Sequence, residues 1–189
     1  LSSGRESLQE IENKNKMTQF NEWSKKDQDK AKSLVQLIDR VGSEVYFASG
    51  AYDRKRNGQS GTVRVLKPES ERFYREANTI LDKLADVNIP NVAHYLLQTL
   101  EFFIPLDPRD VFLRIGQVVR KAQSAGYQYE SVAADLVVKL VNRYLAEYRM
   151  LLSEDETCRE ILVEILDVFI LAGWPSARRL TYRLDEIFR

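Results

Sequence analysis

Residues 129–152 read YESVAADLVVKLVNRYLAEYRMLL, and this stretch decides the fold class. Its apolar side chains recur in steps of four along two adjacent rows, Val132, Leu136, Leu140, Tyr144, Tyr148 and Leu152 in one and Ala133, Val137, Val141 and Leu145 in the other. This period is typical of an α-helix with one broad apolar face. Small side chains line the opposite edge at Ala134, Val138 and Ala146. We therefore predict a helix with neighbours on both sides, the central helix of a stack.

The remainder of the chain shows helix starts and helical periods of the same kind. Proline suits a first helical turn, and it opens apolar-periodic segments at Pro68, Pro90, Pro108 and Pro175. Asp107 is placed to cap the helix that follows it, and Ser153 with Glu156 matches a capping box for a later one. Nearer the N-terminus, Ser24 predicts the start of a long helix over about 25–49. Because no segment alternates as a strand does, the chain is predicted to be all-α.

The predicted helices group into pairs at a regular spacing. Starts at Pro68, Pro108 and Glu154 are separated by 108 − 68 = 40 and 154 − 108 = 46 residues. This spacing matches the period of ~40–47 residues in HEAT and armadillo repeats, whose helix pairs bury their apolar faces by stacking. The expected architecture is stacked antiparallel helix pairs, as a HEAT-like α-solenoid or a helical bundle. We divide the chain into a polar N-terminal arm or frayed helix (1–23), the long helix with an irregular basic loop packed on the body (24–67), and a helical-repeat domain (68–189).

Composition excludes several classes of protein. Lys and Arg number 28, as do Asp and Glu, so the net charge of zero argues against a whole-protein attraction to nucleic acid or to an anionic membrane. A single cysteine, Cys158, cannot form an intrachain disulfide, which fits a reducing, cytoplasmic compartment. No apolar run approaches the ~20 residues of a membrane-spanning helix, and the polar N-terminus lacks a signal-peptide core. Because the chain begins with Leu1, we expect it to be a piece of a longer protein.

No motif of catalysis or of cofactor binding is present. The sequence lacks a phosphate-binding loop, a dinucleotide fingerprint and the paired cysteines or histidines of metal sites. His94 is the only histidine, and both it and Cys158 are interpreted as packing or surface residues. The most acidic tract is interpreted as a solvated helix face that a basic partner would also fit: Glu154, Asp155, Glu156, Glu160, Glu164 and Asp167. We predict no enzyme activity, no cofactor and no metal.

Two basic features are candidates for a binding surface. One is the loop with Arg54, Lys55, Arg56 and Arg64, and the other is the last helix with Arg178, Arg179 and Arg183 beside Tyr182. Arginine pairs with phosphate or carboxylate, and tyrosine stacks on bases. Residues 1–67 hold 13 basic and 9 acidic side chains, a net charge of +4, whereas residues 153–189 hold 5 and 8, a net charge of −3. This polarity also suits head-to-tail contact with another module.

Two stretches carry a resemblance to a known class of protein. They are YQYESVAADLVVKLVNRYLAEYR (127–149) and ILDVFILAGWPSARRLTYRLDEIF (165–188). Residues 89–189 resemble the C-terminal helical regions of large multi-domain bacterial proteins, such as those of ATPase-containing anti-phage defence systems. The resemblance implies a helical-repeat surface for partner contact or target sensing and implies no catalytic residue. Any ATPase of such a system would lie outside this chain, which has no phosphate-binding loop.

The sequence thus predicts a non-catalytic protein-interaction or scaffold module of a larger bacterial protein or complex. Its partner would be another protein or other domains of the same parent. The alternative is a nucleic-acid-contacting accessory domain that uses the basic loop 54–67 and the Arg-rich last helix. The oligomeric state is left open.

Overall fold

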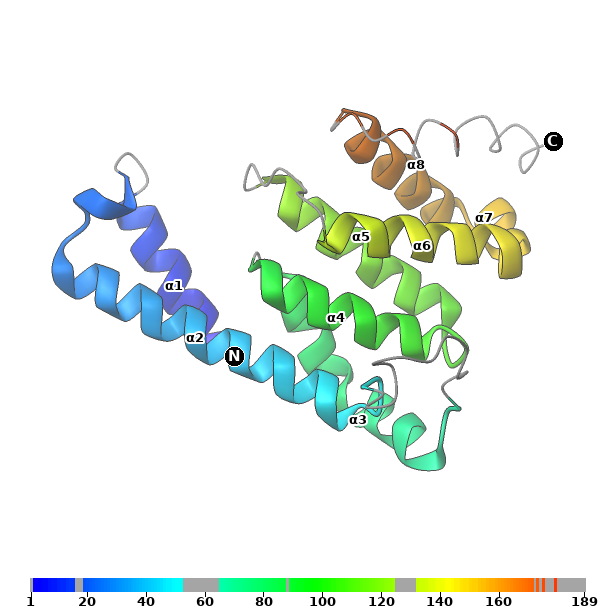
Figure 1. Cartoon of the computed structure of the whole chain (residues 1–189), viewed down its shortest axis with the longest axis horizontal. Helices are drawn as coiled ribbons and strands as arrows, with labels where there is room; N and C mark the ends of the chain where they lie inside the picture. The colour runs from blue at the N-terminus through cyan, green and yellow to red at the C-terminus, as the bar shows by residue number, and fades with distance from the viewer. Residues whose placement is uncertain are drawn as a thin grey trace.

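The structure is a computed structural model that describes residues 2–15, 19–52, 65–87, 89–124 and 132–171, together with Gly173, Pro175 and Arg179. Over these residues the chain is helical and contains no strand, so the all-α prediction is confirmed (Figure 1). The elements of this part are α1 (Ser2–Lys14), the short 3-10 helix η1 (Phe20–Glu22), α2 (Lys25–Ala48), α3 (Pro68–Ala85), α4 (Pro90–Phe103), α5 (Pro108–Ser124), α6 (Val132–Glu147), α7 (Arg149–Glu154) and α8 (Glu156–Leu171).

Most predicted helix starts are confirmed. The helices α3, α4 and α5 each begin at the expected proline. Ser24 caps α2, since its hydroxyl oxygen accepts a hydrogen bond from the backbone N–H of Asp27 at 3.1 Å. The carboxylate of Asp107 accepts from the N–H of Asp110 at 3.0 Å and caps α5. Local sequence is sufficient at these positions because a cap needs only side-chain and backbone groups within one turn.

The capping box predicted at Ser153 and Glu156 was wrong. Asp155 is the residue in extended conformation (φ −89°, ψ 111°), and its carboxylate accepts the N–H of Cys158 at 2.9 Å. The Ser153 hydroxyl instead donates to the carbonyl of Met150, inside the extra helix α7. Ser153 and Asp155 are both residues that can cap a helix. Because α7 extends to Glu154, Asp155 is the one that lies directly before the first residue of α8.

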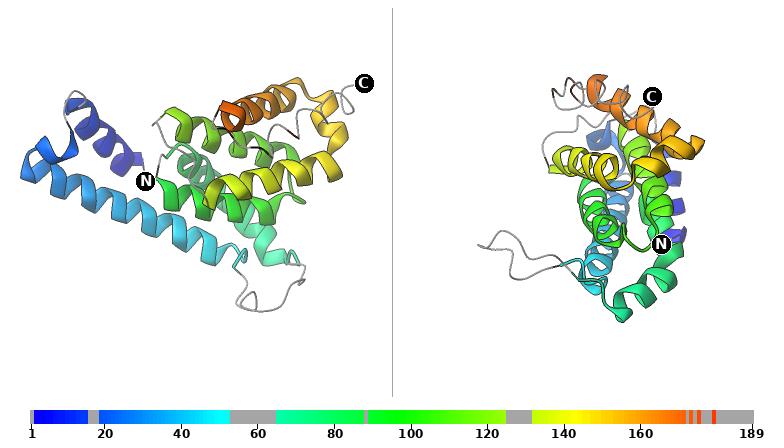
Figure 2. Two further views of the ribbon diagram at one scale, coloured as in Figure 1. Left: turned by 45° about the horizontal axis from the view of Figure 1, so that its top comes forward. Right: turned by 90° about the vertical axis from the view of Figure 1, so that its right-hand side faces the viewer.

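The helices lie in two layers. In one layer α4 packs between α2 and α6, and in the other α5 packs between α3 and α8, as the end-on view in Figure 2 shows. The layers meet where α4 packs on both α3 and α5. These packed helices agree with the predicted helix pairs, and the arrangement suits a bundle as well as a short solenoid. The helix predicted to follow Pro175 lies outside the described residues, apart from Pro175 and Arg179.

The central helix is α4, and the prediction that residues 129–152 form it was wrong. α4 contacts α2, α3, α5 and α6, whereas α6 packs mainly on α4 and α7. The predicted single helix also breaks at Tyr148 (φ −128°, ψ 33°), after which α7 begins. The second side of α6 carries small residues, such as the exposed Ala146 and the half-buried Val138, which need no helix to cover them. Residues 125–131 lie outside the described part.

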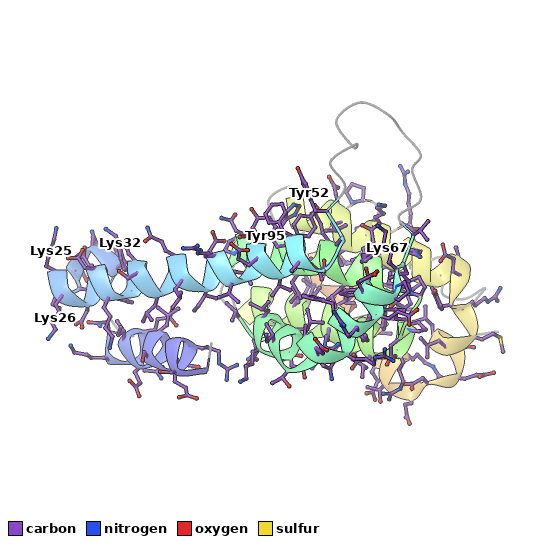
Figure 3. All side chains as sticks on the ribbon, turned by 90° about the horizontal axis from the view of Figure 1, so that it is seen from below. Lys25, Lys26, Lys32, Tyr52, Lys67 and Tyr95 are labelled. Atoms are coloured by element: carbon purple, nitrogen blue, oxygen red, sulfur yellow. The ribbon has the colours of Figure 1, made fainter. Side chains whose placement is uncertain are left out.

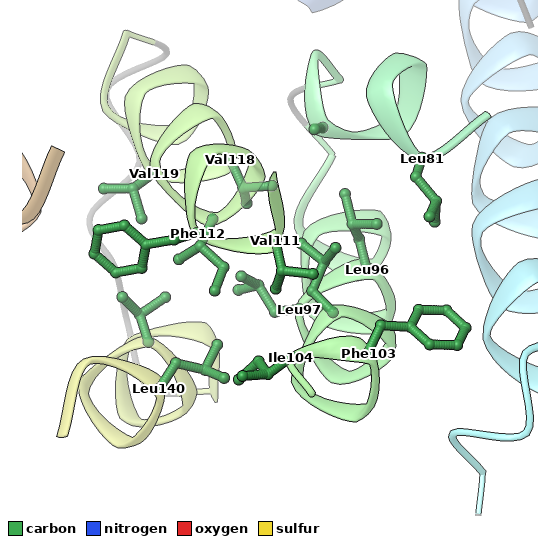
Figure 4. Close-up of a cluster of buried hydrophobic side chains, with 14 of the residues drawn as sticks. Leu81, Leu96, Leu97, Phe103, Ile104, Val111, Phe112, Val118, Val119 and Leu140 are labelled. Atoms are coloured by element: carbon green, nitrogen blue, oxygen red, sulfur yellow. The ribbon is translucent and has the colours of Figure 1, made fainter. Parts of the chain in front are cut away.

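The core fills the space between the two layers. Figure 4 shows side chains from α3, α4, α5 and α6 meeting there. Leu97, Phe103 and Phe112 are fully buried, and the rings of Phe112 and Tyr144 lie 4.5 Å apart. Tyr144 also donates its hydroxyl proton to the carbonyl of Pro108 at 2.8 Å, which ties α6 to the start of α5. Burial of such side chains, at about 25 cal/mol for each Å² of apolar surface, is the main stabilising term.

The N-terminal residues, which the sequence predicted as an arm or a frayed helix, form α1. This helix lies along the first half of α2 (Figure 1). Its buried Ile11 packs inward, and Lys14 pairs with Asp27 of α2 at 2.8 Å. Arg5 pairs with Asp86 at the end of α3. The helix is therefore attached to the body by ion pairs and by apolar side chains, among them Leu8, which packs against the core.

Two helix-interior glycines give a matched test of the packing. A Cβ on Gly116 of α5 would lie 2.4 Å from Ile161 of α8, so the close approach of these helices requires glycine. A Cβ on Gly42 of α2 would lie 3.4 Å from Val92, an ordinary contact. We expect Gly116→Ala to destabilise the fold by about 1–3 kcal/mol through overpacking. Gly42→Ala should stabilise it by about 0.5–1 kcal/mol through helix propensity. Urea unfolding checks both, and equal shifts would contradict the α5–α8 packing.

Candidate interaction surface

Most of the predicted binding residues lie outside the described part of the chain. Arg54, Lys55, Arg56 and Arg64 fall in the gap at 53–64, and Arg178, Tyr182 and Arg183 fall beyond α8. Of the eight, only Arg179 is described, as an exposed residue in helical conformation. The described residues therefore do not test whether the two basic groups lie close together. Both groups stay predictions.

The described residues do show an exposed group of aromatic rings, which the sequence analysis missed. Tyr46, Phe47, Tyr52 and Tyr95 form a contiguous aromatic pad where α2 ends beside α4 (Figure 3). The Phe47 and Tyr52 rings meet edge to face at 4.9 Å, and Tyr46 contacts both at 5.4 and 5.9 Å. Phe47 is 50% exposed and Tyr52 46%. The available sequence signal was the grouping of Tyr46, Phe47 and Tyr52 shortly before the basic run at 54–56.

A tight turn at the end of α2 places Tyr52 in the aromatic pad. Gly50 has φ +84°, a left-handed conformation that glycine adopts without strain, and it ends the helix. The hydroxyl of Ser49 donates to the Tyr46 carbonyl at 2.8 Å and accepts from the N–H of Ala51 at 3.0 Å. Ala51 is fully buried, so the chain is held on both sides of the turn and the next side chain, Tyr52, points outward.

A second surface lies on the outer side of α8. Glu160, Val163, Asp167 and Leu171 follow each other at helical spacing and are exposed, Val163 at 43% and Leu171 at 80%. The interpretation of the acidic tract as a solvated helix face is therefore confirmed, apart from the half-buried cap Asp155. Large apolar side chains interrupt this face, which the sequence analysis did not anticipate.

Among the described residues, neither His94 nor Cys158 belongs to a group of three possible metal ligands. Cys158 is fully buried, and burial together with the nearby Asp155 raises the pKa of its thiol to about 11. His94 is half-buried on α4, with its Nε2 3.0 Å from the side-chain nitrogen of Gln98. Burial lowers the pKa of His94, so the neutral ring is favoured. Both residues fit the packing role predicted for them.

A buried arginine links α3 to α5. Arg114 is only 3% exposed, and its guanidinium donates to Asp82 at 2.8 Å, to the Tyr74 hydroxyl at 3.3 Å, and to Asn78 and Asp110. Tyr74 in turn donates to Asp110 at 2.7 Å. Burial, with the hydrogen bond to Asp110, raises the pKa of Tyr74, so its proton stays in place as a donor. Because all three guanidinium nitrogens are engaged, the cluster is a structural link rather than an open site.

One cavity of about 290 Å³ lies between α5 and α8. Gly116, Val119, Ile165 and Val168 form its apolar lining. Its charged members, Arg120 and Glu164, pair with each other at 2.9 Å. Elsewhere in the described residues, no three His, Cys, Asp or Glu side chains come together as metal ligands would.

The cap of α8 predicts a pH dependence of stability. The hydrogen bond from the Cys158 N–H, and then the Arg109 side chain at 2.6 Å, lower the pKa of Asp155. A carboxylate with a lowered folded-state pKa adds stability above its unfolded value of about 3.9 and loses it as the pH falls through the folded one. We expect Asp155→Ala to lower the melting temperature near neutral pH. The difference in melting temperature between the wild type and this variant should disappear below about pH 4. Asp155→Asn keeps a capping oxygen without the titration, so it should retain part of the stability. Thermal unfolding measures this. A difference in melting temperature between the wild type and the alanine variant that stays constant with pH would contradict the capping role.

Comparisons with protein families, with curated proteins and with solved structures found no match. Among the described residues, no helix is both long enough and apolar enough to cross a membrane. Any functional conclusion therefore depends on the surfaces themselves.

Proposed function

We propose that this chain is a non-catalytic interaction module of a larger bacterial protein or complex. The observation that carries the proposal is the outer face of α8, where Val163 and Leu171 remain exposed beside Glu160 and Asp167. Exposed apolar patches that polar side chains surround are typical of surfaces that contact another protein. The partner would bring apolar side chains for Val163 and Leu171 and basic ones for the two acids.

The charge distribution supports a partner of this chemistry. Residues 153–189 have a net charge of −3 and residues 1–67 a net charge of +4, within a chain of net zero. Opposite charges on the two terminal segments favour end-to-end contact with another charged module, because complementary potentials steer association and disfavour wrong partners.

The resemblance of residues 89–189 to helical regions of anti-phage proteins is the ground for proposing a cytoplasmic, antiviral parent. In that setting the module would hold a partner or sense a target, while chemistry would reside in other domains. If so, changes on α8 should abolish protection of a bacterium against phage without lowering the amount of the parent protein.

Affinity purification of the full-length parent protein tests the module directly. Removing residues 1–189 should release partners that the intact protein retains, and Val163→Asp combined with Leu171→Asp should release the same partners. Met150→Asp is the matched control, because Met150 is 65% exposed and belongs to α7 rather than to α8. Retention of every partner by the α8 variant would reject the proposed surface.

The second candidate is contact with nucleic acid, and the aromatic pad specifically favours it. Three of its four residues, Tyr46, Phe47 and Tyr52, precede Arg54, Lys55 and Arg56 in the sequence. Changing these three residues to alanine should remove binding that weakens steeply with salt, as measured by gel mobility. Unchanged mobility of both DNA and RNA with the wild-type chain would reject this candidate.

A further inference from the structure

The outer faces of α2 and α8 carry opposite charges. Between residues 25 and 40 of α2, five exposed side chains are basic and one is acidic, namely Lys25, Lys26, Lys30, Lys32 and Arg40 against Asp29. Along α8, four exposed side chains are acidic and one is basic, namely Glu156, Glu160, Glu164 and Asp167 against Arg159. Complementary charges of this kind steer two surfaces together and disfavour wrong partners.

The two outer faces belong to opposite sides of the molecule. The helix α2 packs mainly on α1 and α4 at one side, and α8 packs mainly on α5 and α7 at the other (Figure 1). Figure 3 shows Lys25, Lys26 and Lys32 at the end of α2 that projects away from the two helical layers. A contact between the α2 face and the α8 face therefore has to join two separate chains.

Exposed leucines occupy matching positions on the two faces. Leu37 of α2 is 56% exposed and Leu171 of α8 is 80% exposed. Steps of 30 − 26 = 4 and 37 − 30 = 7 residues in α2 equal the steps of 164 − 160 = 4 and 171 − 164 = 7 in α8; the residues are Lys26, Lys30 and Leu37, and Glu160, Glu164 and Leu171. Because such steps keep side chains on one side of a helix, two parallel helices would place each lysine near a glutamate and leucine near leucine.

The charged side chains of this match can accept a partner. Within the described part of the chain, Lys26, Lys30 and Glu160 form no ion pair. Glu164 pairs with Arg120 of its own chain at 2.9 Å and is 51% exposed. A carboxylate has two oxygens that each accept hydrogen bonds, so Glu164 can also accept from a lysine.

A second copy of this chain accounts for both faces at once. A basic protein of another kind would fit the α8 face and leave the α2 face without a partner. Nucleic acid or an anionic membrane would fit the lysines of α2 but would be repelled by the acids of α8. The chain as a whole has a net charge of zero, so two copies experience no overall repulsion.

We propose that the outer face of α2 binds the outer face of α8 of a second copy, with the two helices parallel. Lys26 and Lys30 pair with Glu160 and Glu164, and the two exposed leucines pack together. This inference rests on the proposed function and names a second copy as the partner of the α8 face. Because the contact joins two different surfaces, each pair of chains keeps one free face of each kind, and further copies can add head to tail.

Sedimentation velocity of the whole chain over a range of concentrations tests the proposal. The wild type should associate at low salt and less so at high salt, because salt screens exposed charges. Lys26→Glu combined with Lys30→Glu should weaken the association by about tenfold or more, since like charges would then face each other. Arg72→Glu combined with Arg75→Glu is the matched control, because these exposed residues of α3 change the net charge equally. The control should associate as the wild type does.

Charge reversal on the other face completes the test. Glu160→Lys combined with Glu164→Lys should also weaken the association, and an equal mixture of the α2 and α8 variants should restore it, because every face then meets one of opposite charge. A mixture that stays monomeric, or an α2 variant that associates as the wild type does, would overturn the proposal.

The self-contact and the proposed function fail in different ways. A wild type that stays monomeric at low salt would overturn the self-contact. Other proteins retained by the α8 face in affinity purification would then still support the proposed function. Far-ultraviolet circular dichroism of each variant confirms that the fold is intact.

Discussion

Replacement of Phe103 by alanine is expected to lower the free energy of unfolding by about 3–5 kcal/mol, the largest effect of an apolar truncation that we predict here. Phe103 is fully buried on the central helix α4. Its ring lies 5.0 Å from Tyr74 and 6.3 Å from Phe73 of α3, and 5.3 Å from Phe102. Truncation removes the transfer free energy of the ring and leaves a cavity that packed helices refill only in part.

Urea unfolding followed by circular dichroism measures this effect. Phe20→Ala is the control, because Phe20 of η1 is 43% exposed and its loss should cost less than about 1 kcal/mol. A Phe103 variant that unfolds at the same urea concentration as the wild type would show that α4 is not the central helix.

Replacement of Arg114 by alanine is expected to destabilise the fold by about 3 kcal/mol. The buried guanidinium holds Asp82 and Asn78 of α3 against Asp110 of its own helix, and it also meets the Tyr74 hydroxyl. Removing one member of a buried charged cluster leaves the other members without their partner, which costs about 3–5 kcal/mol. The expected value is at the low end because the Asp82 and Asp110 side chains are 56% and 37% exposed and regain water.

A matched arginine lies on the same helix. Arg120 is 52% exposed and pairs with Glu164, itself 51% exposed, so Arg120→Ala should cost less than about 1 kcal/mol. Arg114→Lys should also destabilise, because an ammonium group cannot reproduce the planar set of donors that reaches four partners. Similar unfolding midpoints for the Arg114 and Arg120 variants would contradict the structural role of the buried cluster.

The sequence was least informative about which aromatic side chains gather at the surface. The aromatic pad joins Tyr46, Phe47 and Tyr52 to Tyr95, which is 43 residues further along the chain than Tyr52. A helical period shows which side of a helix is apolar, but it does not show which rings stay exposed once α2 lies on α4. The Arg114 cluster was missed for the same reason, since its partners Asn78 and Asp82 belong to another helix.

The sequence by itself determined the helical class and most helix starts, because periodicity, first-turn prolines and capping side chains act within a few residues. Ser24, Asp107 and the prolines at 68, 90 and 108 needed no tertiary information. Only the tertiary structure decided that α4 rather than α6 is central, that Asp155 rather than Ser153 caps α8, and that Gly116 permits the close approach of α5 and α8. These outcomes depend on which helices share a boundary and on the volumes that meet there, and such contacts between distant residues leave no period in the sequence.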